Sequence, residues 1–122
     1  STMVRLWSYQ GMYPVAEIRN ATYQQVENAL GTLAETLPGG WLSDQVWVTL
    51  NSNLRSSVYL KNALVTTYKY KPLVGIIEMI DPRGKSTYYD YDVHGRLKEI
   101  YIIEGGIKKL LQENEYKYYN EK

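Results

Sequence analysis

Few side chains in this 122-residue sequence have the chemistry that catalysis or metal binding requires. There is no cysteine, and the single histidine, His94, follows Asp92 closely. Asp90 and Asp92 would share one strand face and could contact a cation, but a metal site needs several converging ligands. The simpler interpretation is that both aspartates belong to a turn or to the surface. No serine lies in a nucleophile elbow beside a base. The sequence therefore predicts no catalytic residue, no metal site and no cofactor.

Tyrosine is the residue type whose number and spacing suggest binding. The chain has 13 tyrosines, 3 tryptophans and no phenylalanine, and a tyrosine offers an apolar ring with a hydroxyl that needs water or a partner. Pairs at i and i+2 put two rings on one strand face. On neighbouring strands these rings would form a ladder on which a sugar could stack. The alternative, which we favour, is that the rings pack across strands and stabilise a sheet. The pairs are Tyr68 and Tyr70, Tyr89 and Tyr91, and Tyr116 and Tyr118.

The aromatic pairs belong to a longer pattern that recurs along the chain. An aromatic pair is followed, eight residues after its second member, by a glutamate and an apolar residue. Such self-similarity is typical of a unit that cannot bury its own apolar face and stacks on neighbours. The copies are Trp7-x-Tyr9 with Glu17-Ile18, Tyr68-x-Tyr70 with Glu78-Met79, and Tyr89-x-Tyr91 with Glu99-Ile100, while Tyr116-x-Tyr118 opens a further copy.

Composition limits the class of protein. At 14.2 kDa the chain fits one domain, residues 1–122, with a modest core. The net charge of +1 provides no field that would attract nucleic acid. No apolar run approaches the length of a membrane span, and the first residues lack the order of a signal peptide. We therefore expect neither nucleic-acid binding nor membrane insertion.

The N-terminal half mixes strands with helices. Residues 4–18 are predicted to form a strand pair, 4–9 and 13–18. From Thr22 the apolar spacing changes to three and four residues, as on an amphipathic helix, and Thr22 with Gln25 forms a capping box. Pro38-Gly39-Gly40 ends this helix. A second helix is predicted over 43–56, although residues 46–49 would also suit a strand. The helical segment is therefore 22–56.

From Leu64 onward the pattern is that of β-hairpins. Residues 96–103 carry apolar side chains on both faces, so we expect both faces of that strand to be covered, one of them by the helical segment. The fold class predicted is α+β, an antiparallel meander of about six strands with one or two helices on one face. The C-terminal strands expected are 64–70, 74–80, 86–92, 96–103 and 108–118.

The turn between two of these strands resembles a known repeat. Tyr91-Asp92-x-x-Gly95-Arg96-Leu97 is similar to the YD repeat of the Rhs family, and Asp81-Pro82-Arg83-Gly84-Lys85 fits the same repeat's preceding turn. Physically, Asp92 can accept from turn N–H groups, Gly95 permits a positive φ, and Arg96 can pair with an acid. The resemblance covers residues 64–119 well and 4–18 weakly, and the helical segment lies outside it.

The resemblance implies a role. In the Rhs family such hairpins line up into a long sheet, which in large members encloses a toxic domain. By likeness, this chain would be a C-terminal piece, with two or three repeats, of a larger secreted or cell-surface bacterial protein. It would act there as a non-enzymatic structural or interaction module, with neighbouring repeats as partners. The autoproteolysis signature of some family members is not matched, because Lys85 follows Gly84. The alternative function is a carbohydrate-binding module that uses the tyrosine ladder.

Strand edges predict self-association. Unpaired edges are templates for another chain. The final strand carries lysines at 108, 109 and 117, which would discourage pairing, whereas no charge guards Leu6–Tyr9 in this way. We therefore expect a homodimer, most simply two-fold, through the N-terminal β-edge or the tyrosine face.

Overall fold

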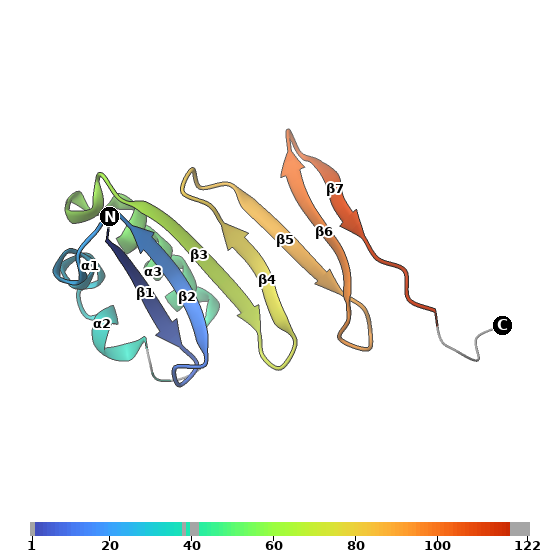
Figure 1. Cartoon of the computed structure of the whole chain (residues 1–122), viewed down its shortest axis with the longest axis horizontal. Helices are drawn as coiled ribbons and strands as arrows, with labels where there is room; N and C mark the ends of the chain where they lie inside the picture. Colours follow the sequence, from blue (N-terminus) through green and yellow to red (C-terminus); the bar gives the residue numbers. More distant parts are fainter. Residues whose placement is uncertain (1, 38, 40–41, 118–122) are drawn as a thin grey trace.

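The computed structural model describes residues 2–37, 39 and 42–117. Within them, seven strands form one antiparallel sheet in chain order, and three helices are inserted between the second and third strands (Figure 1). This is the α+β meander that the sequence predicts. Its seven strands correspond to the seven strand ranges expected, one more than the total of about six. The strands are β1 (Met3–Ser8), β2 (Tyr13–Arg19), β3 (Leu64–Lys71), β4 (Gly75–Ile80), β5 (Ser86–Tyr91), β6 (Leu97–Glu104) and β7 (Ile107–Glu113).

The helices are α1 (Tyr23–Leu30), α2 (Leu33–Thr36) and α3 (Asp44–Ser56), followed by the short 3₁₀-helix η1 (Val58–Leu60). The capping box is confirmed: the Gln25 N–H donates to the Thr22 hydroxyl at 3.2 Å, and the Thr22 N–H donates to the Gln25 side chain at 2.9 Å. The prediction of one continuous helix up to residue 37 is wrong. Gly31, with φ of +60°, ends α1, because glycine reaches that backbone region at little cost.

The core lies between the helices and β1–β3. Among the described residues, every apolar side chain classed as buried lies before position 66, and α3 contributes Trp47, Leu50 and Leu54. The expectation that the helices cover residues 96–103 is therefore wrong. The helical segment leaves β2 and returns to the adjacent β3, so it packs on those strands, while β5–β7 extend beyond it (Figure 1). On β6, Ile103 is 51 % exposed.

One arginine ties α3 to the sheet. The Arg55 guanidinium donates to the carbonyl oxygens of Asp81 at 2.8 Å and Ile80 at 2.9 Å, at the end of β4. It also donates to the Thr67 hydroxyl at 3.1 Å and the Asn51 side-chain oxygen at 3.1 Å. Burial lowers the pKa of Arg55 from its usual value, and the nearby Asp81 acts in the opposite direction. This network holds the helical layer at a fixed position over β3 and β4.

Three hairpins share one defect, an extra residue near the start of the second, or return, strand. The bulged residues are Val15 in β2, Ile77 in β4 and Lys98 in β6. Just before each bulge an aromatic residue of the first strand pairs with the first residues of the return strand. These pairs are Trp7 with Pro14, Tyr70 with Ile76, and Tyr91 with Leu97.

This register corrects the alignment of the repeats. By position in the hairpin, Trp7 is the equivalent of Tyr70 and Tyr91, whereas the sequence pattern pairs Tyr9 with them. Tyr9 instead lies in the β1–β2 turn with φ of +56° and is 5 % exposed. Spacing alone placed the first copy two residues out of register, because it cannot show where a turn absorbs residues.

Candidate functional site

Three tyrosine hydroxyls make the same contact at successive hairpins. Tyr70 and Tyr91 each lie on the first strand of a hairpin, and Tyr116 lies just beyond the end of β7. Each hydroxyl donates to a backbone carbonyl on the preceding return strand, immediately before that strand's bulge. The bonds are Tyr70 to Pro14 at 2.6 Å, Tyr91 to Ile76 at 2.7 Å and Tyr116 to Leu97 at 2.7 Å. We call these residues the bridging tyrosines. They bond hairpin to hairpin, which is a structural use of the hydroxyl.

The surroundings of each bridging tyrosine differ. Tyr91 passes over Gly75, where an added Cβ would lie 2.8 Å from the tyrosine hydroxyl oxygen. Tyr70 stacks on Tyr13, with ring centroids 4.9 Å apart, and burial raises its pKa to about 12. The Arg96 guanidinium lies 4.2 Å above the Tyr116 ring, a cation–π geometry. In all three cases the ring is held by its neighbours as well as by its hydrogen bond.

Only some tyrosines of the predicted ladder bridge hairpins. Tyr70, Tyr91 and Tyr116 bridge hairpins, and Tyr118 lies outside the described residues. Tyr68 and Tyr89 make no hydrogen bond through the hydroxyl among the described residues, and their rings are half-buried. Burial raises the pKa of Tyr68, and nearby Glu17 adds to the shift.

One cross-strand ring pair is not predicted by the spacing of the tyrosines. Tyr88 and Tyr101 stack with centroids 5.3 Å apart and ring planes at 23°. They pair directly across β5 and β6. Only strand register reveals this pair, because neither residue belongs to the i, i+2 pattern.

The two aspartate turns are nearly identical. The Asp81 carboxylate accepts from the N–H groups of Arg83 and Lys85, both at 2.9 Å. The same oxygen of Asp92 accepts from the N–H groups of residues 94 and 96, at 2.8 and 3.0 Å. These backbone bonds lower the pKa of both carboxyl groups, chiefly through the N–H of Lys85 in the first turn and of Arg96 in the second.

The remaining motif residues complete these turns. Gly84 and Gly95 have φ of +84° and +77°, and each donates its N–H to the carbonyl of its turn's aspartate. Pro82 stands at the second position of the first turn. The Arg96 guanidinium donates to the Asp92 carboxylate at 3.0 Å, so its acidic partner belongs to its own turn. Leu97 supplies the carbonyl that Tyr116 reaches. Within the described part of the chain, no three acidic or histidine side chains gather where they could hold a metal.

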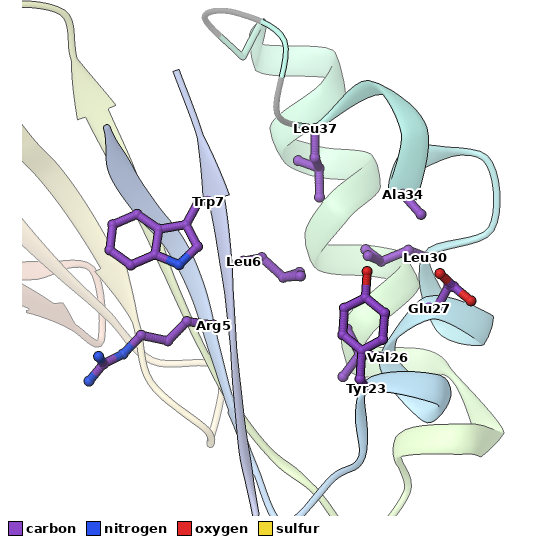
Figure 2. A pocket seen from close by; sticks show the side chains of 9 residues that line it. All are labelled: Arg5, Leu6, Trp7, Tyr23, Val26, Glu27, Leu30, Ala34 and Leu37. Carbon is purple, nitrogen blue, oxygen red and sulfur yellow. The ribbon is translucent and has the colours of Figure 1, made fainter. Parts of the chain in front are cut away.

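An aromatic cleft lies on the sheet face opposite the helices. It has a volume of about 350 Å³. Figure 2 shows Arg5 and Trp7 directed to this face, while Leu6 points toward the helices. Trp7 is 44 % exposed, and Glu17, which also lines the cleft, pairs with Arg19 at 2.6 Å. Rings beside charged groups suit a flat ligand with hydroxyl groups. The lining residues are Arg5, Trp7, Pro14, Glu17, Tyr68, Tyr70 and Ile76.

Comparison with known proteins adds no assignment. Across the described helices, none is both long and apolar enough to cross a membrane. No protein-family model matches the chain, and no curated protein matches its sequence.

Proposed function

We propose that this chain is a non-enzymatic structural and interaction module, a segment of a hairpin-repeat sheet within a larger protein. The recurrent bridging hydrogen bond carries the proposal. Tyr70, Tyr91 and Tyr116 join successive hairpins in the same way, which is the property of a unit built to stack on copies of itself. The resemblance to the Rhs/YD-repeat family supports a bacterial parent that is secreted or displayed at the cell surface.

The distribution of polar groups supports the same role. Asp81 and Asp92 accept backbone N–H groups within their own turns, and three of the tyrosines donate to neighbouring backbone. The side chains that first suggested chemistry are thus used to fix hairpins. The outer strands β5–β7 lie beyond the helical layer (Figure 1), as expected of strands that neighbouring repeats would extend.

Duplicating one repeat tests this proposal. Tyr70 and Tyr91 are structurally equivalent, so a second copy of residues 71–91 inserted after Tyr91 recreates each turn and each bridging bond. In a stacking repeat the longer chain folds cooperatively, and its denaturant m value rises with the added surface. The matched control carries Asp81→Ala and Tyr91→Ala in the inserted copy only. An insertion that proteases cleave as rapidly as they cleave this control contradicts the proposal. So does an insertion that lowers the free energy of unfolding of the whole chain as much as the control does.

We also propose that the isolated chain self-associates through β7. The lysines of β7 that were expected to discourage pairing at this edge form ion pairs with glutamates of β6. Lys108 binds Glu99, and Lys109 binds Glu104 at 2.7 Å. Leu111, the extra residue of the β7 bulge, is 59 % exposed. Light scattering at micromolar concentration should show a dimer, and Leu111→Lys should shift it toward monomer. A monomer in the unsubstituted chain refutes the idea.

A carbohydrate-binding function is the second candidate, favoured by the aromatic cleft. Trp7 and Tyr68 would provide the stacking surface, and Arg5 and Glu17 the polar contacts. Binding on a glycan array that disappears with Trp7→Ala or Tyr68→Ala, and persists with Tyr88→Ala on the opposite face, supports this function. An array without signal removes it.

A further inference from the structure

Trp7 occupies the bridging position of β1, but among the described residues no hairpin lies on the outer side of β1 for it to bridge. It pairs with Pro14 just before the β2 bulge, as Tyr70 pairs with Ile76. β1 is the outermost strand of the sheet, so the described residues offer no return strand on its outer side. The side chain is 44 % exposed. Its indole N–H can donate as a tyrosine hydroxyl does, although it cannot accept.

A groove runs beside the same edge. It lies between β1 and the helices α1 and α2 and has a volume of about 220 Å³ (Figure 2). Its floor is apolar: Leu6 points into it from β1, and Val26, Leu30 and Leu37 form the helical side. Glu27 and Arg5 also contribute to its lining. A side chain on the helix-facing side of an added strand would enter this groove.

We propose that the outer edge of β1 binds the return strand of a further repeat hairpin in the same polypeptide, antiparallel to β1. The Trp7 indole N–H donates to the carbonyl that precedes the bulge of that strand, and an apolar side chain of the strand fills the groove. The inference rests on the proposed function, since it assumes that the sheet is a segment of a longer repeat.

The internal junctions define this occupant. In the β4–β5 junction the bridging Tyr91 lies five residues after Ser86, which pairs with Ile80 at the end of the Asp81 turn. Trp7 lies five residues after Thr2. A copy of residues 64–85 placed directly before Thr2 therefore brings Trp7 opposite Gly75 of the copy, within reach of the Ile76 carbonyl of the copy.

The groove determines which strand fits. In the same register, position 78 of the copy lies opposite Val4, just as Glu78 lies opposite Tyr88. Position 78 is on the helix-facing side of the sheet. Glu78 lies directly opposite Lys69 in the β3–β4 register, so their side chains share a face, and the Lys69 ammonium binds Asp44 of α3 at 2.9 Å. Val4 precedes Leu6 on the helix-facing side of β1, so a glutamate there would lie beside the apolar groove, whose lining also includes Glu27. The partner strand should therefore carry a leucine-like side chain at this position.

A second copy of the chain is a poorer occupant. A two-fold β1–β1 pairing keeps the same faces together, so the α1 and α2 helices of both copies would lie on one face beside the same two strands (Figure 1). A return strand from a repeat hairpin brings no helix with it.

The test is a fusion of residues 64–85 in front of Thr2 of the full chain, made with leucine or with the natural glutamate at position 78 of the copy. Hydroxyl-radical footprinting with mass spectrometry measures oxidation of Trp7 separately from the other tryptophans. We expect Trp7 oxidation to fall by about threefold or more in the leucine fusion as the ring becomes buried. Hydrogen exchange in β1 should slow, and opening of the fused copy should be about tenfold rarer with leucine than with glutamate.

Unchanged Trp7 oxidation in both fusions overturns the inference. A fused copy that remains unfolded overturns it as well. Equal protection with leucine and glutamate overturns the role of the groove. Trp7→Phe in the leucine fusion keeps an aromatic ring but removes the N–H donor, so undiminished exchange protection would refute the indole bond. If the duplication of residues 71–91 folds while the fusion fails to dock, the repeat-sheet function stands and this inference falls.

Discussion

The close contact between Gly75 and Tyr91 offers a direct test of the bridging tyrosines. Gly75 has φ of +149°, and a Cβ there would lie 2.8 Å from the Tyr91 hydroxyl oxygen and 3.4 Å from the ring carbon that bears it. Tyr91→Phe removes the oxygen and the hydrogen bond to Ile76 while leaving the ring. Gly75→Ala adds the Cβ. The two substitutions together should therefore cost less than the sum of their separate effects.

The magnitudes follow from the geometry. Loss of the Tyr91 hydrogen bond should destabilise the fold by about 1 kcal/mol. Gly75→Ala carries backbone strain of about 1–3 kcal/mol at this φ, and in the presence of the hydroxyl it also displaces the Tyr91 ring. When the oxygen is absent, the nearest ring atom lies at an ordinary contact distance, so only the strain remains. We expect a coupling free energy of about 1 kcal/mol, close to the value of the bond that the clash would break.

Thermal and urea unfolding of the four proteins measure this coupling. For 122 residues the melting entropy is about 0.26 kcal/mol/K, so 1 kcal/mol corresponds to about 4 °C in Tm. Tyr89→Phe is the matched control, because the Tyr89 hydroxyl makes no hydrogen bond among the described residues. Additive effects of Gly75→Ala and Tyr91→Phe, or an equal loss with Tyr89→Phe, would refute the structural role of the bridging hydroxyl.

Three further expectations concern other parts of the sheet. Asp81→Ala or Asp92→Ala should lower Tm while Asp90→Ala does not. Because backbone N–H groups lower the pKa of both turn carboxyl groups, their contribution is present above the ordinary carboxyl pKa and should be lost as pH falls through the lowered values. Arg55→Met should reduce the free energy of unfolding in urea by about 2–3 kcal/mol, since it leaves its acceptors at the end of β4 without their donor. Tyr70 holds its proton to about pH 12 when folded, against about 10 in the unfolded chain. Stability should therefore fall as pH rises from about 10 to 12, and Tyr70→Phe should make that decline shallower.

Much of the fold could be predicted because it depends on local chemistry. The capping box at Thr22, the aspartate turns and the alternation of strands each involve residues close in sequence. The break at Gly31 was missed because the apolar stripe continues through it, and periodicity does not report backbone φ. The helices do not cover residues 96–103, contrary to expectation, for a topological reason. An apolar strand face indicates a covering layer only if the chain brings one there.

The candidate site was only partly predictable, for a different reason. Tyr70 and Tyr91 were singled out by spacing, but their role depends on carbonyls fifteen or more positions earlier in the chain. The importance of Trp7 depends on the bulges, which shift β-register by one residue without a signature in composition. Local spacing can thus identify residues that matter without showing what they contact.

The two halves of the sheet are held together by different forces. β1–β3 bury the apolar core beneath the helices, which is the larger stabilising effect. β5–β7 depend on the bridging hydrogen bonds, the aspartate turns and exposed ion pairs, and such ion pairs contribute little individually. A strand such as β7 gains stability mainly from its neighbour, so a sheet of this design becomes more stable as hairpins are added. This dependence of the outer strands on their neighbours, rather than any reactive side chain, is the property that supports the proposed role as a segment of a repeat.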